Sequence, residues 1–300
     1  MRFFSGIPRH DFQWSRRDLP HNAFVGKKIA VIGGTSGIGR ALALALAFRD
    51  AEVVVVGRTF RDQGVPRLRF MQADLTCMKD ALRLAQAVPA ETWDMVIFTT
   101  GILPGRQRAV SPEGIELDMA VSYLNRFVMV REMVPRLGTA RVAAQSKPRV
   151  FIWGFPGTNQ KANTGDFNSE RSYGLMAAHS NTVVGNEALV LDSAKRFPMV
   201  NFFGMNPGLV RSNTRSGVLG KGSLGQKLTE LLFAAFFSGA DAYAQLILPL
   251  LASPDIENQT GALFNRKGNP MHTSYFLTKD PNLQAVVEAS ERLSKRALAT

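Results

Sequence analysis

The residues of this sequence whose spacing most directly suggests chemistry are four glycines, Gly33, Gly34, Gly37 and Gly39. They follow a short apolar run, 28–32, and lead into an alanine- and leucine-rich segment. A strand, a glycine turn and a helix in this order let the backbone approach a pyrophosphate, to which the helix N-terminus presents free N–H groups. The pattern predicts a dinucleotide-binding loop; the alternative is a strand-to-helix turn without a ligand.

Arg58 follows the next run of β-branched residues, directly after Gly57. In NAD-binding folds this position usually holds an acidic residue that binds the ribose 2′-hydroxyl. An acidic side chain would repel a 2′-phosphate, whereas the planar guanidinium of arginine pairs with one. Arg58 therefore predicts NADP(H) rather than NAD(H), and the alternative is an ordinary solvated arginine at a strand end.

The elements that must position these residues alternate between strand and helix along the chain. Such alternation predicts an α/β fold with a parallel sheet covered by helices on both faces. Apolar runs without strict alternation fit strands buried on both sides. We expect one doubly wound, Rossmann-type domain with a mostly parallel, seven-stranded sheet. The expected strands are 28–32, 52–56, 68–72, 93–98, 149–153, 200–205 and 262–265, and the expected helices are 37–49, 79–87, 114–137, 173–196, 224–237, 241–251 and 282–299.

The 300 residues contain no linker and no internal repeat, so we expect a single large domain, 25–300, behind an N-terminal arm, 1–24. Residues 213–240 are expected to form a substrate lid. Four glycines that suit a hinge precede an almost wholly apolar stretch, 229–237, and together they suggest a cover over a hydrophobic ligand. The alternatives are a helix packed on the sheet or in a dimer interface and, less favoured, a membrane-surface patch.

Composition limits the classes of partner. Lys and Arg total 36 against 24 Asp and Glu, and the net charge of +12 raises the question of a nucleic-acid partner. The basic residues are scattered rather than clustered on one element, and no nucleic-acid motif is present, so we expect no such partner. No apolar stretch reaches the roughly 18 residues that a membrane span requires.

Cysteine usage bears on the compartment. Cys77 is the only cysteine, which excludes an internal disulfide and a cysteine-built zinc site, and we expect no metal site. A lone cysteine suits a reducing compartment, and we expect a cytoplasmic protein. The arm carries four arginines, which leaves a mitochondrial presequence open, although acidic residues and prolines interrupt a basic amphipathic helix there.

Taken together, these motifs resemble the short-chain dehydrogenases/reductases. The family's glycine loop is matched at Gly33, Gly37 and Gly39, with Ile32 in place of the usual threonine. Asp74–Leu75 matches the pair that contacts adenine, Thr99–Gly101 occupies the place of an Asn-Ala-Gly turn, and Asn206–Ser212 matches the Pro-Gly motif near the nicotinamide. The resemblance covers about residues 26–262 and implies an oxidoreductase that forms a homodimer or homotetramer through helices 114–137 and 173–196. The cofactor-binding residues that it implies, together with Arg58, are Gly33, Thr35, Ser36, Gly37, Ile38, Gly39, Asp74, Leu75, Thr100, Gly101, Pro207, Gly208 and Val210.

The catalytic positions depart from the family, whose chemistry uses Asn, Ser, Tyr and Lys. The helix register fixed by Asn186 places His179 at the tyrosine position and Val183 at the lysine position. The preceding strand places Phe155 where the serine belongs, and the helix before that places Ser122 where the asparagine belongs. All four positions are therefore substituted.

A second register centres on Tyr173, which also lacks a lysine four residues later and does not align the rest of the helix. Tyr173 and His179 are six residues apart, which is about 600° of helical rotation, so they cannot share one helix face. We favour the register that places His179 at the tyrosine position and keep Tyr173 as a second candidate.

Two hypotheses follow for the chemistry. In the first, His179 replaces tyrosine as the proton donor; an ordinary histidine titrates near pH 6.5 and needs no neighbouring lysine. The protein is then an NADP(H)-dependent reductase of a carbonyl or activated double bond in a lipophilic small molecule, and Trp153 and Phe155 form an apolar wall of the substrate pocket or simply pack in the core. In the second, the redox site is inactive, and the fold serves a cyclisation, an isomerisation or ligand-dependent regulation.

Overall fold

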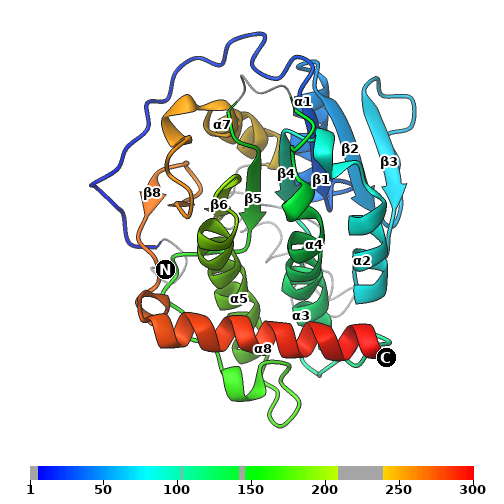
Figure 1. Cartoon of the computed structure of the whole chain (residues 1–300), viewed down its shortest axis with the longest axis vertical. Helices are drawn as coiled ribbons and strands as arrows, with labels where there is room; N and C mark the ends of the chain where they lie inside the picture. Colours follow the sequence, from blue (N-terminus) through cyan, green and yellow to red (C-terminus); the bar gives the residue numbers. More distant parts are fainter. Residues whose placement is uncertain (1–5, 103, 142–145, 209–238) are drawn as a thin grey trace, which may run out of the picture.

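One sheet organises the molecule in the computed structural model, which describes residues 6–102, 104–141, 146–208 and 239–300 (Figure 1). Its strands lie in the order β3-β2-β1-β4-β5-β6-β7-β8, and every neighbouring pair is parallel except β7 and β8. This is the predicted doubly wound α/β fold. The strands are β1 (Lys28–Ile32), β2 (Glu52–Gly57), β3 (Leu68–Gln72), β4 (Met95–Phe98), β5 (Arg149–Trp153), β6 (Asn201–Met205), β7 (Leu263–Phe264) and β8 (Pro270–Met271).

The sheet has eight strands rather than the predicted seven. The additional strand, β8, pairs antiparallel to β7 across a tight turn in which the Asn265 side chain accepts hydrogen bonds from two backbone N–H groups. Two residues, one of them a proline, are too short for a strand pattern that can be recognised from sequence.

Helices cover both faces of the sheet. Consecutive residues of β2 point to opposite sides: Val55 packs with α1 and α7, while Val56 packs in the cluster that includes residues of α2, α4, α5 and α8. This two-sided burial explains the continuous apolar runs in the sequence. The helices are α1 (Gly37–Ala47), α2 (Met78–Ala87), α3 (Leu117–Met119), α4 (Asn125–Met133), α5 (Leu175–Arg196), α7 (Ala240–Ala252) and α8 (Asp280–Ala299). No helix in these four described stretches is long and apolar enough to cross a bilayer.

The segment predicted as one helix over 114–137 is irregular at its start. It begins at Leu117 as the short α3, widens into a π-helical turn over Ala120–Leu124, and continues as α4. The widened turn disturbs the regular backbone ladder. The side-chain amide of Asn125 donates to the carbonyl oxygens of Ala120 and Val121, at 2.7 and 2.6 Å, and so supplies donors at the irregular turn.

The described part of the N-terminal arm, residues 6–24, begins beside β8 and then passes over the α7 end of the molecule toward β1 (Figure 1). Pro8 forms an antiparallel bridge with Met271 of β8. Further along, the Trp14 indole donates to the Gly268 carbonyl at 2.6 Å, and Arg16 donates to two backbone carbonyls. The arm therefore covers the β8 edge before the chain enters β1.

The C-terminal helix α8 lies across α5, α4 and α2 on the outer side of their layer (Figure 1). Its apolar residues join the core cluster of that layer, and the buried Tyr123 hydroxyl contacts Ser290 of α8 at 2.6 Å. The predicted homo-oligomer stays a prediction.

The Tyr123–Ser290 contact generates a stability prediction. Ser290 Oγ donates to the Val286 carbonyl at 2.7 Å, so its hydroxyl oxygen must accept the Tyr123 hydrogen. Ser290→Ala leaves a buried donor without an acceptor and should lower the free energy of unfolding by about 2 kcal/mol. Tyr123→Phe removes that donor and should cost about 1 kcal/mol or less. Urea unfolding followed by circular dichroism measures both; a larger cost for Tyr123→Phe than for Ser290→Ala would contradict the assigned donor direction.

Candidate active site

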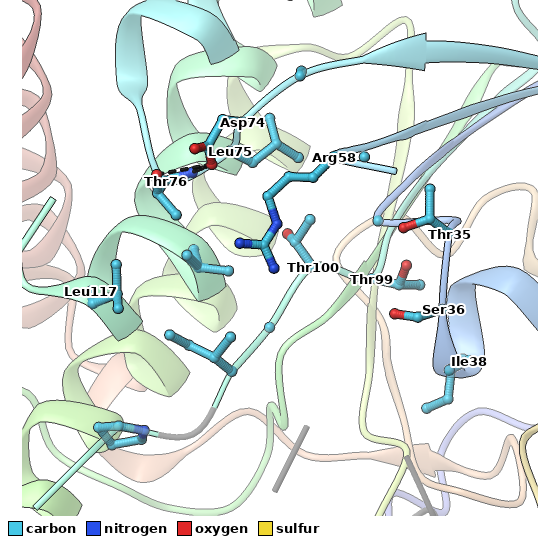
Figure 2. Close-up of a pocket in the computed structure, with 18 of the residues that line it drawn as sticks. Thr35, Ser36, Ile38, Arg58, Asp74, Leu75, Thr76, Thr99, Thr100 and Leu117 are labelled. Carbon is cyan, nitrogen blue, oxygen red and sulfur yellow. Dashed lines mark hydrogen bonds between the residues drawn. The ribbon is translucent and has the colours of Figure 1, made fainter. Parts of the chain in front are cut away.

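A cavity of about 670 Å³ opens at the carboxyl ends of the central strands, where the predicted cofactor loops converge (Figure 2). The loops that follow β1, β2, β3 and β4 all contribute to its wall. This is the location at which open α/β sheets bind ligands. The predicted cofactor residues that line the cavity are Gly33, Thr35, Ser36, Gly37, Ile38, Arg58, Asp74, Leu75, Thr100 and Gly101.

Two glycines in the loop serve different purposes. Gly33 has a φ of +88°, which favours glycine, and a Cβ there would lie 2.7 Å from the Thr100 backbone nitrogen. A Cβ on Gly39 would lie 2.3 Å from Thr99 Oγ1. Gly39 does not line the cavity; it allows the start of α1 to pack closely against the loop that follows β4.

One end of the cavity is suited to anions. The helix α1 begins at Gly37, has no acidic residue in its first turn, and receives no side-chain hydrogen bond from Ser36 at its N-cap. Its first N–H groups therefore have no intrahelical acceptors, and they form the positive end of the helix dipole. Arg58 is exposed and extends into the cavity between the Asp74–Thr76 loop and Thr100, and no carboxylate in the described ranges forms an ion pair with it (Figure 2).

The other end of the cavity is mainly apolar. The apolar side chains that line it come from the loop after β4 and from the start of α3 and the π-helical turn, and they are Ile102, Pro104, Ala109, Leu117 and Val121. Glu116 is the exception. Its carboxylate caps α3 by accepting the Met119 N–H at 2.8 Å, and burial raises the pKa of this carboxyl group.

Two further predicted cofactor residues, Pro207 and Gly208, lie away from the cavity. Both follow β6. The Gly208 N–H donates to the Asn206 side chain at 2.9 Å, which shapes the turn after that strand. Val210 lies outside the described residues, as does most of the predicted lid, from 213 to 238.

His179, the predicted proton donor, is paired with a carboxylate that sequence analysis missed. Its Nδ1 lies 2.9 Å from Asp118 Oδ2, and Asp118 is completely buried. The imidazole retains 11 % exposure. It packs edge-on against the Phe155 ring, with the two ring centroids 6.3 Å apart. His179 does not itself line the cavity, but Leu117 and Val121, which flank Asp118 in sequence, do. The available signal was the spacing of Asp118 and Ser122, two polar residues four apart in an otherwise apolar segment.

Ser122 belongs to the same group of side chains. Its Oγ donates to Asp118 Oδ1 at 2.5 Å and accepts the Ile102 N–H at 3.0 Å. Because the hydroxyl hydrogen is directed at Asp118, Ser122 acts on the carboxylate rather than pointing a donor into the cavity. The two residues therefore link the loop after β4 to His179 on α5.

The remaining candidates occupy separate positions. The Tyr173 hydroxyl donates to the Gly105 carbonyl at 2.7 Å, and burial together with the charges of Glu116 and Asp118 raises the pKa of this phenol. A raised pKa makes a tyrosine a weaker proton donor near neutrality. Trp153 packs in the core on the α1 and α7 side of the sheet and donates to the Tyr243 hydroxyl at 3.0 Å; neither Trp153 nor Phe155 lines the cavity.

A buried arginine holds the floor of the site together. Arg126 of α4 is 1 % exposed, and its guanidinium donates to the Trp153 carbonyl and to Asn186 Oδ1, both at 2.7 Å. It also donates to the carbonyl and hydroxyl oxygens of Thr100. One side chain thus joins the ends of β4 and β5 to the middle of α5. Burial lowers the pKa of the guanidinium.

A buried glutamate orders the loop that carries Phe155. Glu187 of α5 accepts hydrogen bonds from the Gly157 N–H at 2.8 Å and from the Ser274 N–H and hydroxyl at 2.6 and 2.7 Å. Burial raises the pKa of this carboxyl group. Because the Gly157 donor is two residues from Phe155, Glu187 fixes the loop that faces His179.

Comparisons with known proteins agree with this geometry. No model of a known protein family matches the sequence. An uncharacterized oxidoreductase of Saccharomyces cerevisiae is 40% identical over 289 residues, which cover 95% of this chain and 93% of the yeast protein. Mouse retinol dehydrogenase 14 is 26% identical over 88% of this chain and 84% of its own length.

Solved structures share the fold. A short chain dehydrogenase from Salmonella enterica superposes with a TM-score of 0.59 at 16% identity and covers 84% of this chain and all of its own. Pseudomonas aeruginosa RhlG, solved as a complex with NADP, gives a TM-score of 0.61 at 19% identity over 83% of this chain and 98% of its own. The sheet order and the glycine loop at its centre define a Rossmann-type protein. More specifically, the chain belongs to the short-chain dehydrogenase/reductase family of oxidoreductases.

The hydrogen bonds of Arg126 generate a second prediction. Arg126→Met would leave several buried oxygens without donors, at about 1–3 kcal/mol each, so the free energy of unfolding should fall by more than about 3 kcal/mol. Arg126→Lys keeps the charge but loses the planar fork and should give an intermediate loss. Urea unfolding measures both, with exposed Arg61→Met as a control expected to change stability by less than about 0.5 kcal/mol. An Arg126→Met protein as stable as the wild type would contradict this role.

Proposed function

We propose that the protein is an NADP(H)-dependent oxidoreductase that reduces a carbonyl group or an activated double bond in a lipophilic small molecule. The observation that carries this proposal is the cavity itself, which is lined by an exposed arginine, by a helix N-terminus and by apolar side chains that include Leu117, the sequence neighbour of Asp118.

The residues present fit the cofactor. The first N–H groups of α1 would hold the pyrophosphate, and Arg58 would pair with the 2′-phosphate in a position where its guanidinium has no carboxylate partner among the described residues. Asp74 and Leu75 border the same end of the cavity, where the family binds adenine. The RhlG complex with NADP is an example of this fold holding that cofactor.

When bound, the reduced nicotinamide supplies the hydride, and the protein must supply the proton. His179 would hold that proton on Nε2 and deliver it to the substrate oxygen, or to the corresponding carbon acceptor of an activated double bond, as its Nδ1 faces Asp118. Val183 stands at the family's lysine position. It is uncharged and only 2 % exposed, so it cannot bind the ribose as that lysine does.

The apolar end of the cavity supports a lipophilic substrate. Ile102, Leu117 and Val121 offer carbon surface rather than hydrogen-bonding groups to whatever binds there. Retinol dehydrogenase 14, which is similar over most of this chain, is by name an enzyme of such a substrate. We therefore propose apolar ketones, aldehydes, quinones or enones as the substrate class.

Cofactor preference is tested by Arg58→Asp. The substituted carboxylate should repel the 2′-phosphate, so NADPH affinity should fall by at least about tenfold, whereas NADH affinity should stay the same or improve. Fluorescence titration with both cofactors measures this. Arg61→Asp makes the same charge change at an exposed residue outside the cavity lining and should leave both affinities unchanged. Equal affinity of the wild type for NADPH and NADH would contradict the proposal.

The role of His179 is tested by loss of absorbance at 340 nm with a panel of lipophilic carbonyl compounds and enones. His179→Gln retains an amide that can donate to Asp118 but cannot transfer a proton, and His179→Phe removes both functions. Both should lower kcat by at least about 100-fold, with NADPH binding retained as the control for folding. Full activity of His179→Gln would remove His179 from the mechanism. NADP binding without any cofactor turnover in the wild type would instead favour a non-redox enzyme or a ligand-dependent regulator.

A further inference from the structure

Asp118 is the buried acidic group whose surroundings are least explained by the fold alone. It lies on the three-residue α3, is 0 % exposed, and its carboxylate reaches across to a helix 61 residues later in the chain. A buried carboxylate is costly unless hydrogen bonds and opposite charge compensate for the lost hydration. The contacts of Asp118 therefore indicate what the group is for.

Both carboxylate oxygens of Asp118 have assigned donors. Oδ1 accepts from the Ser122 hydroxyl at 2.5 Å, and Oδ2 faces His179 Nδ1 at 2.9 Å. Thr182 Oγ1 lies 3.5 Å from Oδ2, but it donates more closely to the His179 carbonyl, at 2.8 Å. With a hydroxyl hydrogen on one oxygen and an imidazole nitrogen on the other, the arrangement suits an ionised carboxylate that accepts Nδ1–H.

That arrangement fixes which imidazole nitrogen can do chemistry. When Nδ1 donates to a carboxylate, the neutral ring carries its lone pair on Nε2. Among the described residues no hydrogen-bond partner of Nε2 is present, and the ring keeps its 11 % exposure. Nε2 is therefore the ring nitrogen left free to exchange a proton.

The charges also form a consistent set. The family pairs an acid that becomes an anion, tyrosine, with a cationic lysine. Here the buried Val183 takes the lysine position. The proton donor is an imidazolium, which becomes neutral when it gives up its proton, and it faces the carboxylate of Asp118. A carboxylate favours the protonated form of an adjacent imidazole, so the sign of the helper charge reverses together with the sign of the acid.

We propose that Asp118 is the positioning residue for His179, with its carboxylate holding the Nδ1–H tautomer and stabilising the imidazolium, and with Ser122 holding the carboxylate. This inference rests on the proposed function of His179 as the proton donor and extends it to two residues that would not touch substrate.

Other groups set the electrostatic background of the pair. Glu116 and Tyr173 lie within electrostatic range of Asp118 and, like it, carry or can acquire negative charge. Arg126 supplies positive charge from α4, and Arg108 acts on Glu116 and Tyr173. From α5 the neighbour is the uncharged Thr182, and from the loop after β5 it is the Phe155 ring.

The decisive variant is Asp118→Asn, which keeps the size and removes the charge. In ¹⁵N long-range spectra of the imidazole, we expect the neutral wild-type His179 to be the Nδ1–H tautomer and the variant to lose that preference. In the reductase assay, kcat should fall by at least about 100-fold with KM changed less than about threefold, because the residue does not touch substrate. The alkaline limb of the pH–rate profile should move to lower pH, because a carboxylate favours the protonated form of an adjacent imidazole.

Two further variants complete the test. Asp192→Asn removes a carboxylate at the far end of α5, where it pairs with Arg131, and should leave the tautomer and the pH profile unchanged. Ser122→Ala keeps the Asp118 charge but removes one donor, and it should therefore change both readouts by less than Asp118→Asn does.

The outcomes are separable. An unchanged tautomer and an unchanged pH profile in Asp118→Asn would overturn the proposal even if the enzyme is an active reductase. If Asp118→Asn does not fold, a neutral wild-type His179 that carries its hydrogen on Nε2 would overturn it instead. If the wild type reduces none of the compounds, the proposed function fails, and the imidazole spectra alone decide whether Asp118 holds the ring.

Discussion

The structure depends on a cation placed where water cannot reach it. The Arg126 guanidinium is enclosed between the ends of β4 and β5 and the middle of α5, and its hydrogen bonds go to neutral oxygens of Thr100, Trp153 and Asn186. A buried charge is stable only when its donors are matched by fixed acceptors. Matching them fixes the relative positions of the loop after β4, the loop after β5 and the helix α5 that carries His179.

The site near Arg126 holds charged groups in two different environments, one exposed and one buried. At the exposed end of the cavity, Arg58 and the start of α1 present positive charge to solvent, where it costs little to maintain. Beneath the cavity lining, the buried Asp118 carboxylate accepts a hydroxyl hydrogen from Ser122, faces His179 Nδ1 and is within electrostatic range of Arg126. The first arrangement suits a ligand that arrives with its own charge, and the second suits a proton that must be held away from bulk water.

Sequence reasoning predicted the features that depend on local chemistry. The order of strands and helices follows from local patterns and is confirmed. The glycine loop and Arg58 also follow from a few consecutive residues, and both line the cavity, while the ligand assigned to them stays a prediction. The Asp118–His179 contact could not be predicted in the same way, because it joins residues 61 positions apart. In addition, Asp118 lies just before a π-helical turn, which no periodicity in the sequence indicates. The two-residue β8 was missed for lack of length, and the Trp153 environment because an aromatic strand residue can face either side of a sheet.

The arm that runs beside β8 has a consequence for how the molecule behaves among its own copies. A terminal strand offers unpaired N–H and C=O groups to any neighbouring chain. Here the Arg9 N–H donates to the Pro270 carbonyl, and the Ile7 carbonyl accepts the His272 N–H. Behind that edge lie Phe264 and Met271, both buried. Residues 7–9 therefore block intermolecular strand pairing at β8. A protein truncated from the N-terminus past Arg9 would leave the β8 edge unpaired, and this edge would favour aggregation.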